Sequence, residues 1–333
     1  MKYIHSLILL FTFSVFTQSA YAVTFKMATL SPEGSVWMSK MREGAAEIKK
    51  RTKGRVKFKF YPGGVMGDSN AVLRKIRIGQ LHGGALTGGT LTRFYKDNQI
   101  YSLVMKYKTP DEIKYIRQNL DATVQEGIKK GGFTTFGFAE SGFAYVMSSN
   151  NPIPSVAALQ KQKAWIPAND EVALEAVSTF GVTPIPLPLG DVLAGLQTGL
   201  IDTIAASPIG ALALQWYTQI KYITELPVLY SYGVLAISNK AFKKAKPDDQ
   251  KIVSEVMTKI FKEMDVINKN DNKSALAALK NQGVKFIKPT AEQVKEWLTF
   301  AKKSQQRMLE TGKISKEIVA RADKLLQQYH AKK

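Results

Sequence analysis

The chain has 333 residues, of which 45% are hydrophobic and 22% are charged, and it contains no cysteine. These values are typical of a globular protein with a large core, and the length suggests about two domains. The absence of cysteine excludes a disulfide framework and a lipid-modified cysteine, so packing alone must stabilise the fold.

The formal net charge of +20 at pH 7 would suit a polyanion partner. Basic residues are densest in KKRTKGRVKFKF (49–60). There Lys57 and Lys59 alternate with apolar residues, as in a strand with one face in water, and the cations at 49–51 end a predicted helix, where they suit its dipole. A solvated surface accounts for this cluster, so polyanion binding is the weaker alternative and we expect no nucleic-acid partner.

The N-terminus reads MKYIHSLILLFTFSVFTQSAYA. A basic start, an apolar stretch at 7–16 and the small-residue pattern Ala20-Tyr21-Ala22 predict a secretory signal peptide over 1–22. A membrane anchor is the weaker alternative, because the apolar stretch is short and ends in polar residues. We therefore expect an exported protein, cleaved after Ala22, whose mature chain starts at Val23.

The first half of the mature chain alternates predicted strands and helices. Ser31 is the expected N-cap of the first helix and Pro32 its first residue. This alternation predicts a parallel α/β sheet with helices on its faces. The predicted strands are 23–30, 56–63 and 83–89, and the predicted helices are 31–54, 70–81 and 110–130.

The second half repeats this pattern and adds two long elements. An extended segment at 227–239 is long enough to pass through two sheets, and a helical pattern at 247–283 would reach roughly 50 Å, enough to lie across two domains. The other predicted strands are 133–140, 143–149, 164–167, 200–208 and 284–289. The other predicted helices are in 151–163, 170–181, 191–199, 209–223 and the remainder after 289.

These elements predict an α/β fold of the two-domain clamshell type found in periplasmic binding proteins, with the long helix spanning both domains. Strands crossing near 137–147 and 231–238 would form its hinge. We expect domain I to comprise 23–142 with 236–275, and domain II to comprise 143–235 with 276–333. Ligands in such folds bind at strand carboxyl ends and helix N-termini, in the cleft between the domains.

Candidate catalytic groups are scarce. His82 is the only histidine outside the signal peptide and the C-terminal tail, so paired-His metal sites are absent and a Ser-His-Asp triad would have to use His82. No GxSxG motif, dinucleotide loop or Walker lysine occurs. Carboxylate pairs of the glycosidase type stay open from sequence, although caps and polar cleft groups are the simpler roles for the acids near strand ends. We therefore predict no enzyme, and we expect no cofactor and no metal ligands.

Four segments carry a family resemblance: GRVKFKFYPGGVMGD (54–68), LRKIRIGQLHGGALT (73–87), PLGDVLAGLQTGLIDT (188–203) and SPIGALALQWYTQIKYIT (207–224). Over nearly its whole length, the mature chain resembles the periplasmic solute-binding subunit of tripartite ATP-independent periplasmic (TRAP) transporters, the DctP-like family. The resemblance implies a small, usually carboxylate-bearing metabolite, bound between two α/β domains and delivered to an ion-gradient-driven membrane permease.

The resemblance also implies two arginines that this chain lacks. The family's ligand-binding arginine lies in the stretch corresponding to KQKAWIPAND (161–170), where this chain has Trp165, and a second arginine position falls on Ala144. An indole offers an apolar face and one N–H donor, but it does not replace the bidentate guanidinium. Lys163 or Arg93 could supply the cation instead, and ordinary core packing is the alternative role for Trp165.

Further candidate ligand-binding residues lie where predicted strands end or cross between the domains. Leu189 and Ser207 correspond to family positions near the ligand. The full set of candidate ligand-binding residues comprises Trp165, Arg93, Ser31, Glu33, Thr87, Gly88, Gly89, Glu140, Tyr145, Asn169, Asp170, Leu189, Ser207 and Trp216.

We therefore expect a solute-binding protein that closes by hinge motion on a small solute, an organic acid by resemblance. The missing arginines leave room for a weakly charged, aromatic or cationic solute, and a secreted enzyme or a polyanion-binding protein is the alternative function. We expect Trp165→Ala to weaken solute binding about tenfold or more with little loss of stability.

Overall fold

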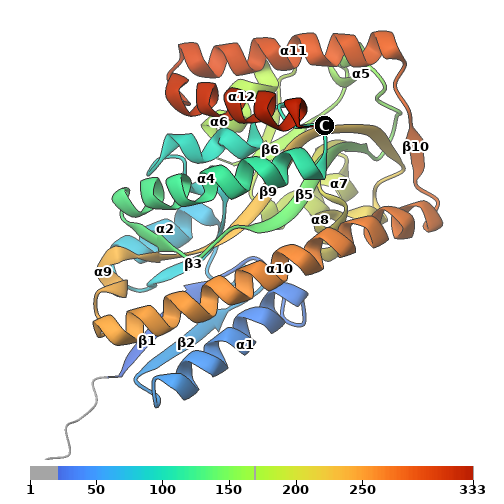
Figure 1. The fold of residues 1–333 in the computed structure, drawn as a ribbon. Coiled ribbons are helices and arrows are strands. Elements are labelled where there is room, and N and C mark those ends of the chain that lie inside the picture. The colour runs from blue at the N-terminus through green and yellow to red at the C-terminus, as the bar shows by residue number, and fades with distance from the viewer. Residues whose placement is uncertain (1–21, 169, 333) are drawn as a thin grey trace, which may run out of the picture.

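The structure is a computed structural model that describes residues 22–168 and 170–332, so the predicted signal peptide lies outside the described residues except for Ala22 (Figure 1). The strands are β1 (Val23–Ala28), β2 (Val56–Tyr61), β3 (Gly83–Thr87), β4 (Phe133–Thr135), β5 (Ala139–Ser148), β6 (Trp165–Pro167), β7 (Ile185–Leu187), β8 (Thr203–Ala206), β9 (Tyr222–Ser238) and β10 (Lys285–Ile287).

The α-helices are α1 (Val36–Arg51), α2 (Ser69–Arg77), α3 (Gly88–Leu91), α4 (Pro110–Lys130), α5 (Val156–Leu159), α6 (Glu171–Ser178), α7 (Val192–Thr198), α8 (Pro208–Ala213), α9 (Asn239–Phe242), α10 (Pro247–Asn281), α11 (Ala291–Glu310) and α12 (Lys316–Ala331). Three 3-10 helices join them: η1 (Lys96–Ser102), η2 (Leu189–Asp191) and η3 (Trp216–Thr218). Among the described residues, no helix combines the length and the apolar character that a membrane span requires.

A mixed sheet runs through the molecule in the order β2-β1-β3-β9-β5-β8, with β4 and β10 also paired to β9. β1 is parallel to β2 and β3, as predicted for the first half, whereas β9 is antiparallel to β3 and β5. A separate parallel pair, β6 and β7, extends the second half, and one bridge from Ala164 to Thr203 links it to β8. The sheet therefore continues across both halves of the molecule.

Strand β9 provides that continuity. Its 17 residues begin beside β10, continue along β5 and end between β3 and the short β4. Successive side chains of a strand point to opposite faces, so Leu235 and Ile237 join a buried cluster with α1 and α10, while Val234 and Ala236 join another with α4 and α12. The predicted long extended segment is confirmed, and the strand starts five residues earlier than 227.

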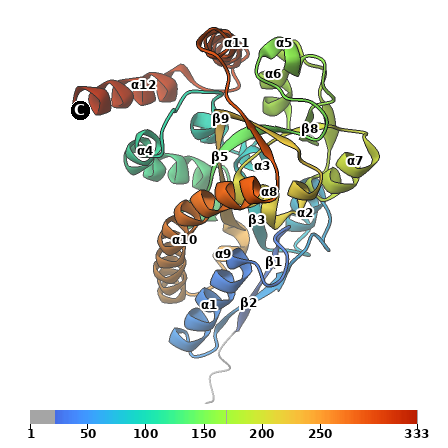
Figure 2. The ribbon, with the colours of Figure 1, turned by 90° about the vertical axis from the view of Figure 1, so that its right-hand side faces the viewer.

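Helix α10 is the second element common to both halves. It has 35 residues and begins at Pro247, a proline in the first turn. At 1.5 Å per residue it would span about 50 Å. It packs against α1 and β5, and its later part packs against α8, as Figures 1 and 2 show. The predicted helix across both halves is therefore confirmed.

Four predicted elements differ from the structure. The first helix begins at Val36, after Ser35 rather than Ser31 acts as N-cap and accepts the Met38 N–H at 3.3 Å. The predicted helix 209–223 is the short α8 followed by η3, because Gln215 adopts a left-handed φ of 59° and breaks the helix. The two strands predicted within 133–149 are β4 and one longer, bulged β5.

The last two helices lie on different halves of the molecule. α11 packs on α6, whereas α12 packs on α4 and η1. The sequence assigns α4 and η1 to domain I and all of 276–333 to domain II, so α12 lies on elements of the other predicted domain. The domain limits stay a prediction.

Candidate ligand-binding site

Four of the predicted residues meet in one cluster in the second half, which we call the Trp165 cluster. Trp165 and Trp216 are buried and pack edge to face, with ring centroids 5.5 Å apart. Tyr145 and Leu189 are half-buried and pack against the same apolar group. The sequence offered each of these residues separately as a ligand-binding candidate, and the structure brings the four side chains together in one apolar cluster.

Trp165 is more deeply involved in packing than the sequence suggested. Only 8% of the residue is exposed, and its indole N–H donates to the Leu187 carbonyl at 3.0 Å. The donor is thus already used within the protein, and the ring faces serve the cluster. Truncating a buried tryptophan to alanine costs about 3–5 kcal/mol, so we no longer expect Trp165→Ala to leave stability nearly unchanged.

A second group of predicted residues meets where α3 and α6 begin. Asp170 is the N-cap of α6, with Oδ1 accepting the Ala173 N–H at 2.9 Å. A Cβ added to Gly89 would stand 2.2 Å from the Asp170 Oδ2, so this carboxylate lies directly against the Gly89 backbone. Burial raises the pKa of Asp170, against the lowering effect of its backbone hydrogen bonds. The contact joins residues from opposite predicted domains.

Gly88 also needs to be glycine. A Cβ there would come within 2.7 Å of the Tyr232 ring, which is buried under α3. The Gly88 carbonyl accepts the Asn98 side-chain N–H at 2.8 Å, and Thr87 pairs its hydroxyl with that of Thr90 at 3.0 Å. These contacts fix the start of α3 where it faces Asp170.

Ser207 and Glu140 lie at the crossing of the two halves. Ser207 is buried at the N-cap of α8, where its Oγ accepts the Gly210 N–H at 3.2 Å and lies 2.8 Å from the Ser141 Oγ. The side-chain amides of Asn268 and Asn272 on α10 donate to the backbone carbonyls of Glu140 and Ser141. Helix α10 therefore holds the bulged start of β5 in place.

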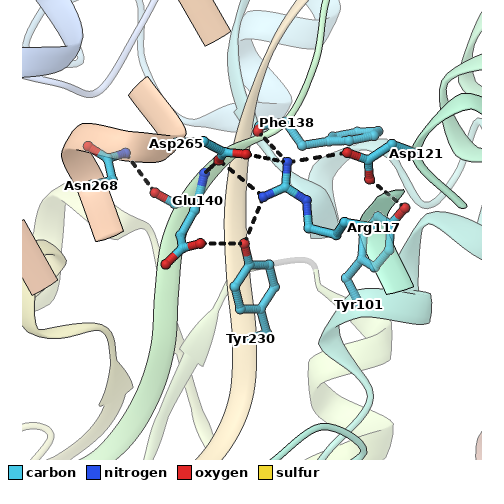
Figure 3. A network of polar contacts seen from close by, with 8 residues as sticks. All are labelled: Tyr101, Arg117, Asp121, Phe138, Glu140, Tyr230, Asp265 and Asn268. Carbon is cyan, nitrogen blue, oxygen red and sulfur yellow. Dashed lines mark hydrogen bonds and ion pairs between the residues drawn. The ribbon is translucent and has the colours of Figure 1, made fainter. Parts of the chain in front are cut away.

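A buried polar network extends from Glu140 (Figure 3). The Tyr230 hydroxyl donates to the Glu140 carboxylate at 3.3 Å and accepts a hydrogen bond from Arg117 at 2.9 Å. Arg117 also pairs with Asp265 at 2.9 Å and with Asp121 at 3.3 Å. The network therefore ties α4, β5, β9 and α10 together, and we call it the Arg117 network.

Burial raises the pKa of Glu140, and the nearby Asp265 carboxylate raises it further. Arg117 acts in the opposite direction and so do the hydrogen bond from Tyr230 and the charge of Lys269. Three carboxylates thus surround one guanidinium at the point where β5 and β9 cross.

The remaining predicted residues lie away from these groups. Glu33 is exposed and forms an ion pair with Arg42 at 2.6 Å. The hydrogen bond from Arg42 lowers the pKa of Glu33. Arg93 is exposed and donates to Asn70 at 2.9 Å, while Lys163 is exposed and donates to the Gly199 carbonyl at 3.0 Å.

Ser31 donates its backbone N–H to the Thr29 hydroxyl at 3.0 Å. Ala144 stands where the family resemblance implies a second arginine, and only 1% of this residue is exposed. Asn169 lies outside the described residues.

Trp37 is a residue that sequence reasoning missed. It lies in the first turn of α1, against Gly233 of β9 and edge to face with Phe261, with ring centroids 5.7 Å apart. Its buried indole N–H has no hydrogen-bond partner in the described part of the chain. The sequence placed the helix start at Ser31, whereas the helix begins at Val36 and Trp37 lies in its first turn. The error in the helix start therefore concealed Trp37.

A surface hollow of about 960 Å³ does not coincide with these groups. It lies between α6 and α11, is open to solvent, and is lined by residues such as Leu174, Lys303 and Glu310. An ion pair from Arg307 to Glu175 bridges it at 2.6 Å. We place the candidate site at the Trp165 cluster and the Gly89–Asp170 contact instead, because strand ends and helix starts of both halves converge there. Within the described ranges, no cluster of three His, Asp or Glu side chains could hold a metal ion.

Comparisons with known proteins agree with this architecture. The sequence profile of the bacterial extracellular solute-binding proteins, family 7 (DctP), matches residues 27–311. The sialic acid-binding periplasmic protein SiaP of Vibrio cholerae is 21% identical over 86% of this chain and 90% of its own. The 2,3-diketo-L-gulonate-binding periplasmic protein YiaO of Escherichia coli is 24% identical over 72% of this chain and 73% of its own.

Solved structures are similar in fold. A TRAP periplasmic solute-binding protein from Ralstonia eutropha, with bound (S)-2-acetolactate, has a TM-score of 0.83 at 18% identity and covers 92% of this chain and 99% of its own. One from Xanthobacter autotrophicus, with bound β-D-galacturonate, has a TM-score of 0.82 at 17% identity and covers 91% and 99%. These likenesses establish the two-domain clamshell fold.

Proposed function

Because the chain belongs to family 7 of the bacterial extracellular solute-binding proteins, we propose that it is the solute-binding subunit of a TRAP transporter. It captures one small solute, an organic acid, between its two α/β halves and delivers it to the TRAP membrane permease. The solute class follows that of similar structures, in which galacturonate, glucuronate and erythronate are bound. Its role is binding and transport rather than catalysis.

The proposed site lies between the Trp165 cluster of the second half and the Gly88–Gly89 turn of the first half. The contact between Gly89 and Asp170 is the observation that supports it most directly, since it joins the two halves at strand ends and helix starts. Closure on a solute would use β5 and β9 as the hinge strands, with α10 bracing both halves. The domain limits 23–142 with 236–275 and 143–235 with 276–333 belong to this proposal.

The family is periplasmic, and the proposal includes export by the signal peptide 1–22 with cleavage after Ala22. Only the solute-bound, closed form would present the right surface to the permease. The solute must therefore bind the closed state better than the open state, and tight binding alone would not suffice.

The proposal is tested by native mass spectrometry of protein purified without denaturation, followed by small-angle scattering of the ligand-free and ligand-bound forms. We expect one small molecule per chain and a smaller radius of gyration when it is bound. Conversion of that molecule to a product during incubation would contradict the proposal in favour of an enzyme. An affinity that falls steeply with rising salt would favour polyanion binding instead.

A further inference from the structure

We propose that one face of the first half docks on membrane surfaces rich in anionic phospholipid. The inference goes beyond the proposed function and does not rest on it, because this face lies at the other end of the strands from the proposed solute site. Three observations support it: unpaired lysines that share one face of the sheet, the basic end of α2 on the same side, and an exposed aliphatic side chain among these cations.

The lysines stand on β1 and on β2, the edge strand of the sheet. Register places Lys26 of β1 opposite Lys59 of β2, and Lys57 lies two residues before Lys59. Side chains of a strand alternate between its faces, so these three lysines share one face. Phe25 and Phe58 point the other way, to the buried cluster with α1 and α10. All three lysines are exposed.

The end of α2 lies on the same side of the sheet. A Cβ added to Gly84 would stand 3.4 Å from Val72 of α2, and Gly84 pairs with the residue two positions after Lys26. Helix α2 therefore packs on the face of the sheet to which Lys26 points. Its last turn brings two exposed arginines, Arg74 and Arg77, to this side. We call these two arginines and the three strand lysines the basic face.

Acidic side chains are scarce around the basic face. Between Glu47 and Asp97 the sequence contains one acid, Asp68, and it caps the opposite end of α2. In the part of the chain that the structure describes, no cation of the basic face forms an ion pair, whereas Arg55, just before β2, pairs with Asp249 at 2.7 Å. The positive charge of this face is therefore not neutralised within the protein, and it attracts anions.

An exposed aliphatic side chain stands among these cations. Ile78 directly follows Arg77 and lies one helical turn from Arg74. Ile78 is 76% exposed, more than any other large apolar residue in the described ranges. Surfaces that bind phospholipid combine cations, which meet the headgroup phosphates, with apolar side chains, which enter the interface. Ile78 therefore favours a lipid surface over a soluble anion.

Two other roles for the basic face suit it less well. Single-stranded nucleic acids are held by stacking their bases on aromatic rings. Tyr61 is the one aromatic residue on this face of β1 and β2, and the Lys59 ammonium lies over its ring, 5.3 Å from the centroid. Lysines on an edge strand also prevent pairing with another chain, and that role alone predicts no affinity for lipid.

The basic face and the proposed solute site lie at opposite ends of β3. The site uses the carboxyl end of this strand, at Gly88, whereas Lys26 is level with its start. There the Lys26 backbone N–H donates to the Nδ1 atom of His82 at 3.0 Å, and His82 directly precedes β3. A protein docked through the basic face would therefore keep its solute site open.

The test is co-sedimentation of residues 23–333 with vesicles of phosphatidylcholine alone and of phosphatidylcholine with about 30 mol% phosphatidylglycerol. We expect binding only to the anionic vesicles, with a partition coefficient that falls about tenfold between about 50 and 150 mM salt. Equal binding to both kinds of vesicle, or no binding to the anionic kind, would overturn the inference. Retention on heparin without binding to vesicles would also overturn it, in favour of a soluble polyanion.

A charge variant tests whether the basic face makes the contact. The combined change Lys26→Gln, Lys57→Gln and Lys59→Gln should weaken binding to the anionic vesicles about thirtyfold or more, because each cation near such a membrane contributes about fivefold. These side chains are exposed, so the variant should fold, which its thermal unfolding checks.

A matched control removes the same charge from the second half. Lys161, Lys288 and Lys295 are exposed, and none forms an ion pair within the described ranges. Changing all three to glutamine should alter vesicle binding by less than about threefold. Equal losses in the two triple variants would overturn the inference, because net charge alone would then account for binding.

A second pair of variants tests the choice of lipid over a soluble anion. Ile78→Ser should weaken vesicle binding about threefold and leave any retention on heparin unchanged. Leu200, which is 51% exposed, follows α7 in the second half much as Ile78 follows α2, so Leu200→Ser is the control and should change neither. Equal effects of the two serine variants on vesicle binding would count against a lipid surface.

The inference and the proposed function fail separately. A chain that co-purifies with one solute but does not bind anionic vesicles keeps the proposed function and loses this inference. A chain that binds the vesicles through the basic face and holds no solute gives the opposite result.

Discussion

At Gly89 the backbone of the first half comes into contact with the Asp170 carboxylate of the second half, because glycine has no Cβ. Asp170 cannot easily turn away, since its other oxygen caps α6 through the Ala173 N–H. A methyl group at position 89 would stand 2.2 Å from the Asp170 Oδ2, far inside contact distance.

We predict that Gly89→Ala weakens solute binding about tenfold or more, because the two halves can no longer approach fully and the closed state becomes less favourable. The unfolding free energy should change little, because the halves can relieve the clash by opening. Solute affinity by calorimetry and the radius of gyration by scattering, with and without solute, check this expectation.

Two further variants make the result specific. Gly190→Ala adds the same methyl group where nothing lies within 4 Å, and it should bind as the unmodified protein does. Asp170→Ser keeps a capping side chain but shortens it, so adding it to Gly89→Ala should recover part of the affinity. Full affinity in Gly89→Ala alone would show that this contact does not limit closure.

The residue types of the site were easier to predict than their contacts. Strand ends and the family resemblance identified Trp165, Trp216, Tyr145 and Leu189, and these residues do meet. The use of the Trp165 N–H by Leu187 depends on the parallel pairing of β6 with β7, which joins segments about twenty residues apart and leaves no local signal. Trp37 was missed because a helix start displaced by a few residues changes which side chain lies over the strand ends.

At the scale of elements, β5, β9, α4 and α10 meet around the Arg117 network. Asn268 and Asn272 hold the start of β5 by its carbonyls, and Tyr230 of β9 links Glu140 to Arg117. The two long crossing elements are therefore joined by buried polar contacts as well as by sheet pairing. Buried polar networks of this kind fix geometry, and an unpaired member would be costly.

The raised pKa of Glu140 has a defined consequence for stability. A carboxyl group whose pKa is higher in the folded state than in the unfolded state lowers the unfolding free energy of the protein as pH rises. The loss runs from the unfolded-state pKa, 4.5, through the folded-state pKa. Above that window the folded protein carries a carboxylate that burial and Asp265 disfavour. Below it, the protonated group imposes no such cost.

We therefore predict that Glu140→Gln is more stable than the unmodified protein at pH 7.5, and that the difference shrinks as pH falls to 4.5. The glutamine side-chain oxygen can still accept the Tyr230 hydroxyl. Thermal unfolding at several pH values measures the difference in stability between the two proteins. The titration of Asp121 and Asp170 cancels in this difference, because both proteins contain these two residues. A difference that grows toward acid pH would show that the interaction with Arg117 outweighs burial.

The errors in predicting elements have a common physical cause. The apolar pattern at 209–223 suits a helix, yet its last residues pair in register with β10, at Tyr222 opposite Lys285. That pairing joins residues more than sixty positions apart, and periodicity within a short window does not contain it. α4 and α10 were predicted almost residue for residue, because their start signals, including Pro110 and Pro247 in the first turn, are local.

For the whole molecule, α12 is the element that the family comparison does not account for, because the matched region ends at residue 311. It lies on α4 and η1, with Ile318, Val319 and Ala322 buried in the same cluster as apolar residues of α4. Asp323 pairs with Lys106, and Arg321 donates to the Thr123 hydroxyl at 2.9 Å. The C-terminus thus returns from α11 on the second half to brace the first half.

We predict that removing residues 316–333 lowers the unfolding free energy by several kcal/mol, because each buried Ile or Val side chain contributes about 1.5–3 kcal/mol. Solute affinity should stay within about threefold, because α12 contributes no residue to the proposed site, and the truncation spares the pairing of Lys313 with Glu171 on α6. Chemical denaturation measures the first effect and calorimetry the second, with removal of only residues 332–333 as the control. If the truncation lowers the free energy of solute binding by as many kcal/mol as the unfolding free energy, α12 takes part in closure. The two halves would then have to be coupled through the C-terminus as well as through β5, β9 and α10.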